Sequence, residues 1–274
     1  MIIEFLGSKV RAAVLICLVK ASRFSLPVNP RSIARVYGVN LSETYRFLRR
    51  LVDFGIALKN DHGYVLSSRG LEIFESMLEL LPNPEPWRSR ELEFIRRVLP
   101  DTMYYVSQPM LQSWFGLTPT LLVVDKKLRG RINLPSGFIN LSSRRRPGSG
   151  NRVFVVYSSL RGREYKYSWD SYLTHATIEQ SYADLISYMP TWEDFLPDVL
   201  LKSSLFDMDK LLEKTTLEGR SRIATAIAYY STLSGWRPPL KMNLYSLVSE
   251  DLVDRLVAIT PYLVDSSIIE SRRI

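Results

Sequence analysis

The chain has few of the residues that build metal sites and covalent crosslinks. It holds one cysteine, Cys17, among 274 residues, which excludes a disulfide within the chain and a cysteine-rich zinc site. Its two histidines, His62 and His175, cannot form the His-x3-His pair with which a helix holds zinc. We therefore expect neither a metal nor another cofactor.

The motifs of several common enzyme classes are also missing. The sequence contains neither the glycine-rich loop that cradles phosphates nor the Gly-x-Ser-x-Gly turn of serine hydrolases. The apolar pattern around Cys17 predicts a buried thiol. These absences argue against nucleotide-dependent and nucleophilic enzymes, so we expect no catalytic residues.

Long apolar runs are absent as well. No run approaches the roughly 20 residues that a membrane helix needs. The apolar segment 12–19 (AAVLICLV) follows Glu4 and precedes Lys20 and Arg23, without the small-residue pattern of a signal cleavage site. We interpret it as the first helix of a globular domain and expect a cytoplasmic protein without membrane contact.

Positive charge is in excess and lies in two blocks. The net charge is +8, and residues 1–70 contain 11 Lys/Arg against 4 Asp/Glu, while residues 119–170 contain 11 against 3. The segments 71–118 and 171–274 are net acidic. Such clustering favours a polyanion or an acidic protein as the partner of each basic block.

Within the first block, residues 29–69 have the pattern of a DNA-reading unit. Asn29 and Pro30 are typical of an N-cap and a first helical position, which predicts a short helix over residues 31–37 that ends at Gly38. Asn40 predicts the start of a second helix, because its side chain can accept from the N–H of Glu43 while the Glu43 carboxylate reaches back.

The second helix is predicted to be amphipathic. Its inward positions by helical spacing are Leu41, Tyr45, Leu48, Leu51 and Val52. Its outward face then carries three arginines and small hydroxyl residues, a composition suited to a DNA major groove. The members of this face that we expect to touch DNA are Ser42, Thr44, Arg46, Arg49 and Arg50.

Two short apolar runs around Asn-Asp-His-Gly follow Gly55 and predict a β-hairpin. The order helix, turn, helix, hairpin resembles winged-helix regulators. We expect Arg31 and Arg35 to contact the DNA backbone from the first short helix, and Lys59 with His62 to contact it from the hairpin. The alternative is a helical hairpin that serves protein contact only.

The chain is predicted to have α+β architecture in three parts. Residues 1–80 form the winged-helix domain, residues 81–117 a proline-containing helical linker, and residues 118–274 a mixed domain. Short β-rich runs from Thr118 onward predict a small, mostly antiparallel sheet. Thr177 and Gln180 then predict a capped helix and the start of a helical C-terminal region.

The second basic block contains a polar loop, SSRRRPGSGNR, at residues 142–152. Its glycines and arginines are unsuited to a core. We consider it a second contact for nucleic acid or for a partner protein, carried by Arg144, Arg145, Arg146 and Arg152.

This layout, with a helix opening TIEQSYADLIS at residues 177–187, resembles the AbiEi-type antitoxins of abortive-infection toxin–antitoxin systems (type IV). Glu179 and Asp184 match a glutamate and an aspartate that this family carries at that place. The resemblance implies a repressor of its own operon that opposes a nucleotidyltransferase-like toxin. The likeness to winged-helix regulators implies binding as a homodimer. The loop at Arg144–Arg146 and the tail after Trp236 have no counterpart in the pattern.

Two other functions fit parts of the sequence. A metal-dependent nuclease could use Asp125 and Glu164 to hold Mg²⁺ and Lys166 to polarise water. A ligand-responsive transcription factor could enclose a small molecule between four aromatic residues, Trp169, Tyr172, Tyr182 and Trp192. The interpretation that we adopt is a sequence-specific DNA-binding regulator, acting on double-stranded DNA as a repressor.

Overall fold

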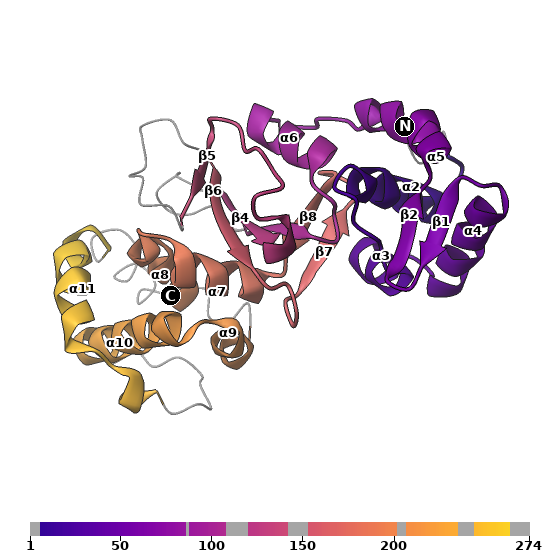
Figure 1. Cartoon of the computed structure of the whole chain (residues 1–274). Coiled ribbons are helices and arrows are strands. Elements are labelled where there is room, and N and C mark those ends of the chain that lie inside the picture. Colours follow the sequence, from indigo (N-terminus) through magenta and orange to yellow (C-terminus); the bar gives the residue numbers. More distant parts are fainter. Residues whose placement is uncertain are drawn as a thin grey trace. The chain divides into compact units, whose positions relative to one another are not determined.

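The computed structural model describes residues 6–85, 88–107, 120–141, 153–201, 207–234 and 244–263. The fold is α+β, as predicted (Figure 1). It divides into two compact units, one of residues 1–106 with 122–175 and the other of residues 107–121 with 176–274. The first eighty residues therefore share a unit with most of the sheet.

Three helices open the first unit: α2 (Lys9–Ser22), α3 (Pro30–Tyr37) and α4 (Leu41–Asp53). The apolar segment 12–19 lies in α2, where every residue from 12 to 21 is buried. This confirms its assignment to a core helix. No helix in the described parts of the chain is both long and apolar enough to cross a membrane.

The predicted hairpin is present as β1 (Ala57–Asn60) and β2 (Gly63–Leu66), paired antiparallel with Lys59 opposite Tyr64. Val28, outside both strands, forms an isolated antiparallel bridge with Tyr64 of β2. The N–H of Val28 donates to the Tyr64 carbonyl at 2.8 Å, and the N–H of Tyr64 donates to the Val28 carbonyl at 3.0 Å. Gly63 permits this contact, since a Cβ there would lie 2.5 Å from the Val28 carbonyl oxygen. The chain before α3 is thereby tied to the hairpin.

A helical stretch follows the hairpin. Ser67 caps α5 (Ser68–Phe74) by accepting from the N–H of Gly70. The 3-10 helix η1 (Glu75–Leu80) and helix α6 (Arg90–Val98) come next. Ile95 of α6 is buried in the core beside the sheet.

The sheet has six strands in the order β5-β6-β4-β3-β8-β7. Their bounds are β3 (Tyr104–Ser107), β4 (Thr120–Asp125), β5 (Phe138–Asn140), β6 (Val153–Ser158), β7 (Tyr165–Ser168) and β8 (Leu173–Ala176), with the 3-10 helix η2 (Lys126–Leu128) after β4. β3 pairs with β8 in parallel, and so does β5 with β6. The sheet is thus mixed, with these two parallel pairs among its five strand pairings.

Two segment predictions are wrong. Residues 104–107 were expected in a helix and form β3 instead, because an all-buried strand shows no alternation of apolar and polar residues. Residues 131–134 (RINL), one of the β-rich runs after Thr118 that predict strands, are irregular. The polar loop 142–152 and residues 108–119 lie outside the described residues.

Apart from the ends of β3, β4 and β8, the described parts of the second unit are helical or lie between helices. Thr177 caps α7 (Ile178–Tyr188) as predicted. The remaining elements are η3 (Trp192–Phe195), α8 (Leu196–Leu201), α9 (Met208–Lys214), α10 (Leu217–Ser234), η5 (Tyr245–Leu247) and α11 (Glu250–Leu263). Tyr182, Trp192 and Phe195 are buried at its centre.

Candidate nucleic-acid interface

The turn between α3 and α4 is fixed by its caps. Asn29 Oδ1 accepts from the N–H of Arg31 at 2.9 Å, and Gly38 ends α3 with a left-handed φ of 64°. Asn40 Oδ1 accepts from the N–H of Glu43 at 3.0 Å, which starts α4 one residue later. The reciprocal bond from Asn40 N–H to the Glu43 carboxylate is not formed between these two described residues.

One face of α4 is exposed and cationic. Ser42, Arg46, Arg49 and Arg50 are all exposed, and at 100° per residue they form a single stripe along the helix. Within the described part of the chain, none of the three guanidinium groups has a carboxylate in ion-pair or hydrogen-bond range. Their charge is therefore available to an external anion.

The predicted orientation of Thr44 is wrong. The residue is fully buried, and its hydroxyl donates to the Asn40 carbonyl at 2.7 Å. A threonine can face the core of a helix in this way because its hydroxyl is satisfied by the carbonyl one turn earlier. Leu41, predicted to face inward, is exposed.

The hairpin turn presents its own polar groups beside these helices. Lys59 on β1 and His62 in the turn are exposed. Asn60 Oδ1 accepts from the N–H of His62 at 3.0 Å, which holds the two-residue turn closed. Both side chains thus project from a hairpin tied to the loop before α3.

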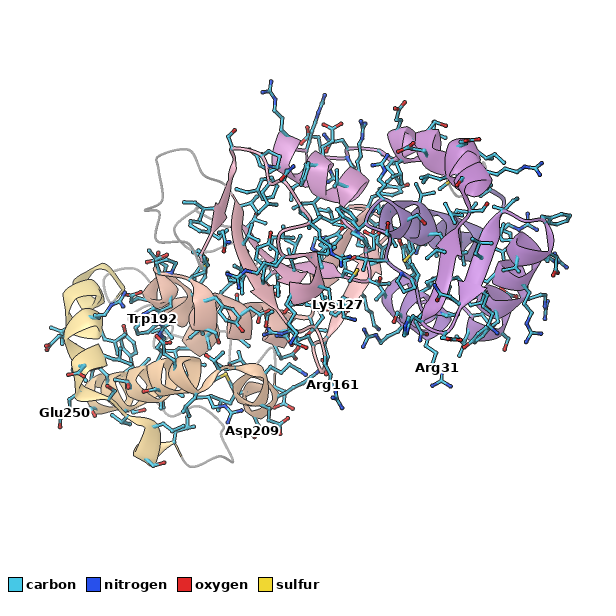
Figure 2. The ribbon with its side chains drawn as sticks, in the orientation of Figure 1. Arg31, Lys127, Arg161, Trp192, Asp209 and Glu250 are labelled. Carbon is cyan, nitrogen blue, oxygen red and sulfur yellow. The ribbon has the colours of Figure 1, made fainter. Side chains whose placement is uncertain are left out.

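The two arginines of α3 have different surroundings. Arg31 is exposed and projects away from the ribbon (Figure 2). Arg35 donates from Nη2 to the Tyr165 hydroxyl at 3.2 Å, and its guanidinium carbon lies 5.3 Å from the centre of the Tyr165 ring. Arg35 therefore contacts β7, which the sequence did not indicate.

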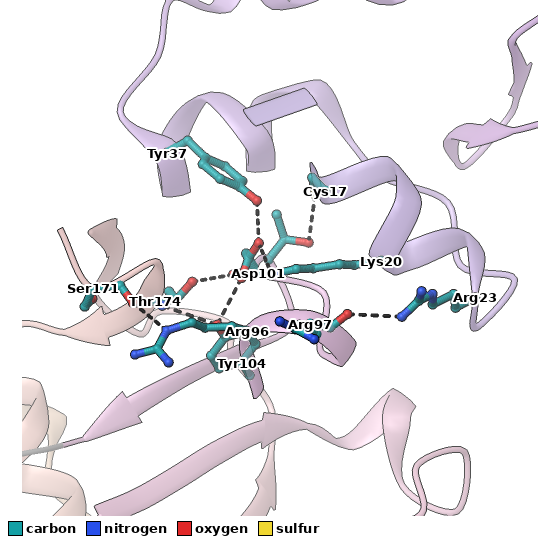
Figure 3. Close-up of polar contacts among 11 residues, drawn as sticks. Cys17, Lys20, Arg23, Tyr37, Arg96, Arg97, Asp101, Tyr104, Ser171 and Thr174 are labelled. Atoms are coloured by element: carbon teal, nitrogen blue, oxygen red, sulfur yellow. Dashed lines mark hydrogen bonds and ion pairs between the residues drawn. The ribbon is translucent and has the colours of Figure 1, made fainter. Parts of the chain in front are cut away.

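A buried polar network joins the first helices to the sheet. Asp101 accepts from Lys20 of α2 at 2.8 Å, from the hydroxyl of Tyr37 of α3, and from the hydroxyl of Tyr104 of β3 at 3.0 Å (Figure 3). Tyr37 also packs on Tyr167, with ring centres 4.4 Å apart. These contacts hold α2 and α3, the two helices on which α4 packs, against the sheet.

Burial sets the ionisation of several groups in this unit. It lowers the pKa of Lys20, although Asp101 opposes the shift, and it raises the pKa of Cys17 to about 12. Burial also lowers the pKa of His175 to about 4, with the nearby positive charge of Arg96 adding to the shift. His175 Nε2 lies 2.7 Å from the hydroxyl of Ser171. His175 is thus a packed residue of β8.

The residues of the nuclease hypothesis lie around β4 and β7. Asp125 Oδ1 caps η2 by accepting from the N–H of Lys127 at 2.9 Å. Lys166 is exposed on β7, and Glu164 precedes that strand half-buried. Among the described residues there is no group of three or more histidine, cysteine, aspartate or glutamate side chains that could hold a metal.

The four aromatic residues of the ligand hypothesis divide between the two units. Trp169 packs in the first unit against Tyr37 and Tyr167, at ring-centre distances of 5.8 and 5.0 Å. Tyr182 and Trp192 are fully buried in the second unit. Trp192 lies between two guanidinium groups, those of Arg222 and Arg255, at 5.1 and 5.2 Å from its ring. Tyr182 and Trp192 thus belong to the core of the second unit, whereas Trp169 and Tyr172 are half-buried in the segment between β7 and β8.

The two acidic residues that carry the antitoxin resemblance lie on α7. Asp184 is buried and accepts from Ser107 Oγ and Gln180 Nε2, each at 3.1 Å. Glu179 is half-buried in the first turn of the helix. Asp184 therefore orders the interior of the second unit. The basic-loop residues Arg144, Arg145, Arg146 and Arg152 lie outside the described residues.

Searches with family models, among curated proteins and among solved structures found no match to this chain. The likeness to AbiEi-type antitoxins therefore stays a prediction from the sequence. The interpretation of the interface depends on its own geometry and charge.

Proposed function

We propose that the protein binds double-stranded DNA through a winged helix-turn-helix formed by α2, α3, α4 and the β1–β2 hairpin, and that it regulates transcription. The observation that carries the proposal is the exposed face of α4, where Arg46, Arg49 and Arg50 have no carboxylate partner among the described residues. Uncompensated guanidinium groups on one helical stripe suit phosphates and the O6 and N7 atoms of guanine.

The arrangement around α4 supports the same reading. In helix-turn-helix proteins the second helix enters the major groove, and its N-terminal residues contact base edges. Ser42 and Arg46 occupy that part of α4, while Arg49 and Arg50 lie about one turn further on. The single bridge from Val28 to Tyr64 ties the chain before α3 to the hairpin, and we assign the exposed Lys59 and His62 of this hairpin to the wing.

The remaining cations are assigned by their surroundings. Arg31 at the start of α3 is exposed and suits a contact with the DNA backbone. Arg35 is engaged with Tyr165, so we assign it to the support of α3 on the sheet. Thr44 is buried and is removed from the expected contacts.

Selection of duplexes from a randomised library by the full-length protein tests this function. We expect enrichment of one sequence, with specific binding that weakens steeply as salt rises. A pool that stays random after repeated rounds at low and moderate salt would contradict sequence-specific binding. The same selection with Arg46→Ala, Arg49→Ala and Arg50→Ala combined serves as the matched control and should not enrich that sequence.

The resemblance supports a narrower role, in which the protein represses its own operon and opposes a nucleotidyltransferase-like toxin. Co-expression with a nucleotidyltransferase-like protein encoded beside it tests this role. Rescue of growth by the parent chain is expected. If no such neighbour exists, or growth is not rescued, the antitoxin role is wrong while DNA binding stands on its own test.

A further inference from the structure

A cavity of about 650 Å³ lies within the first compact unit, between the start of α3 and the sheet. One wall comes from the end of α2, residues 26–29, α3 and the hairpin turn. The other comes from residues 102–103, the junction of β4 with η2, residues 160–162 and β7. Its volume is within the range of roughly 300 to 1,000 Å³ that small-molecule sites occupy.

Three cations line this cavity: Arg35, Lys127 and Arg161. Figure 2 labels the last two, which come from η2 and from the loop between β6 and β7. Within the described residues, neither Lys127 nor Arg161 has a carboxylate in ion-pair range. The lining carboxylate, Asp125, already caps η2 through its Oδ1. The cavity is therefore net positive and selects anions.

Part of the cavity lining is apolar. Leu26, Met103 and Leu160 contribute this part, and Leu160 is buried at 5% exposure. The ring of Tyr165 adds an aromatic surface, held by stacking on Tyr105 at 5.1 Å between ring centres. Such a mixture of apolar walls and a few convergent charges is typical of sites for small organic molecules. A bare inorganic anion would leave these walls uncovered.

We propose that this cavity binds a small phosphorylated metabolite. The phosphate lies between Lys127 and Arg161, and the apolar or aromatic part of the molecule covers Leu26, Met103 and Leu160. A phosphate monoester fits this pair of cations better than a carboxylate does. It carries nearly two negative charges and three acceptor oxygens, so it can bind two cations that come from separate segments of the chain.

The position of the cavity predicts an effect on the proposed DNA binding. His62 belongs to the hairpin turn and Ser32 to α3, and both line the cavity together with residues of the sheet and its connecting loops. A ligand that contacts both walls favours one arrangement of these elements, and its binding and DNA binding then change each other by the same factor. This step rests on the proposed function, whereas ligand binding itself does not.

Calorimetry and thermal shift with the full chain, without DNA, test the site. The probes are AMP and glucose 6-phosphate, with adenosine and glucose as uncharged counterparts. We expect at least one phosphorylated probe to bind and to raise the melting temperature, and its uncharged counterpart to do neither. Lys127→Gln combined with Arg161→Gln should abolish the effect. Lys126→Gln, an exposed neighbour outside the cavity, should preserve it.

Several outcomes would overturn the proposal. The first is that neither phosphorylated probe binds the parent chain. The second is that the double variant binds a phosphorylated probe as tightly as the parent does. The third is that no probe binds, while the double variant lowers the slope of log K against log salt for DNA binding by about two. That result would make Lys127 and Arg161 contacts to DNA phosphates. Both side chains are exposed, and the two single variants give a second measurement should the double variant misfold.

The regulatory step has its own readout. With the selected duplex, the bound probe should change the DNA affinity of the parent at least about fivefold and that of the double variant not at all. Probe binding with unchanged DNA affinity contradicts regulation by this site. If no duplex is selected, the DNA-binding proposal fails. The calorimetric result still decides whether the cavity binds a phosphorylated molecule.

Discussion

Lys20 donates from Nζ to both carboxylate oxygens of Asp101 at 2.8 Å, and both side chains are completely buried. The pair joins α2 to the segment just before β3, across 81 residues of sequence. A buried charge that loses its partner is strongly destabilising, because its desolvation is no longer compensated. The pair is thus a fixed connection between the helices that carry the proposed interface and the sheet.

Replacement of Lys20 by methionine leaves Asp101 charged, buried and without its cation. We expect the free energy of unfolding to fall by about 3 to 5 kcal/mol. Denaturant titration followed by circular dichroism measures the change. The double variant Lys20→Met with Asp101→Leu removes both charges and should recover part of the loss. A Lys20→Met protein as stable as the parent would show that the pair does not hold the unit together.

The thiol of Cys17 reports on the opening of the first unit. Burial raises the pKa of this thiol to about 12, so the reactive thiolate is scarce at neutral pH. We expect no reaction with a thiol reagent in the folded protein at pH 8, and one equivalent after unfolding in guanidinium. Because Cys17 is the only cysteine, the absorbance change is assigned without ambiguity. Rapid labelling of the native protein would contradict the burial of α2.

His175 predicts a pH dependence of stability. Its pKa is lowered from 6.5 to about 4 in the folded chain, so between these values the unfolded chain binds more protons. Stability contributed by neutral His175 is complete above pH 6.5 and is lost as the pH falls toward 4, up to about 3 kcal/mol.

The control for this prediction is His175→Gln, which keeps a polar atom near Ser171 and does not titrate. The difference in unfolding free energy between parent and variant, measured from pH 7.5 to pH 4, isolates the histidine from the carboxylates. A difference that does not change with pH would show that His175 has an ordinary pKa.

Lys59 is expected to contact a DNA phosphate from the wing. Lys59→Ala should weaken binding to the selected duplex and to unrelated duplexes by a similar factor, and should lower the slope of log K against log salt by about one. Fluorescence anisotropy at several salt concentrations measures both quantities. A loss confined to the selected duplex would instead make Lys59 a base contact.

Local signals in the sequence predicted the helix starts well. Asn29, Asn40 and Thr177 each cap the helix that follows, because a capping side chain bonds to a backbone only two or three residues away. The hairpin at Asn60 was predicted for the same reason. Short-range chemistry of this kind is visible in one sequence.

Long-range contacts were not predictable in this way. Nothing near Lys20 indicates that its partner is Asp101, and nothing near Arg35 indicates Tyr165. The sequence shows the excess of basic residues in segment 119–170, but only the fold places Lys127 and Arg161 around one cavity. Thr44 was misplaced because its bond to the Asn40 carbonyl lets a polar residue face the core.

The central claim is that the arginine face of α4 reads DNA, and the affinity of Arg46→Ala for the selected duplex tests it most directly. We expect a loss of about 1 to 3 kcal/mol together with weaker discrimination at one base pair. Arg90→Ala, an exposed arginine on α6, should bind like the parent. The account is contradicted if Arg46→Ala, Arg49→Ala and Arg50→Ala each bind the selected duplex as tightly as the parent does.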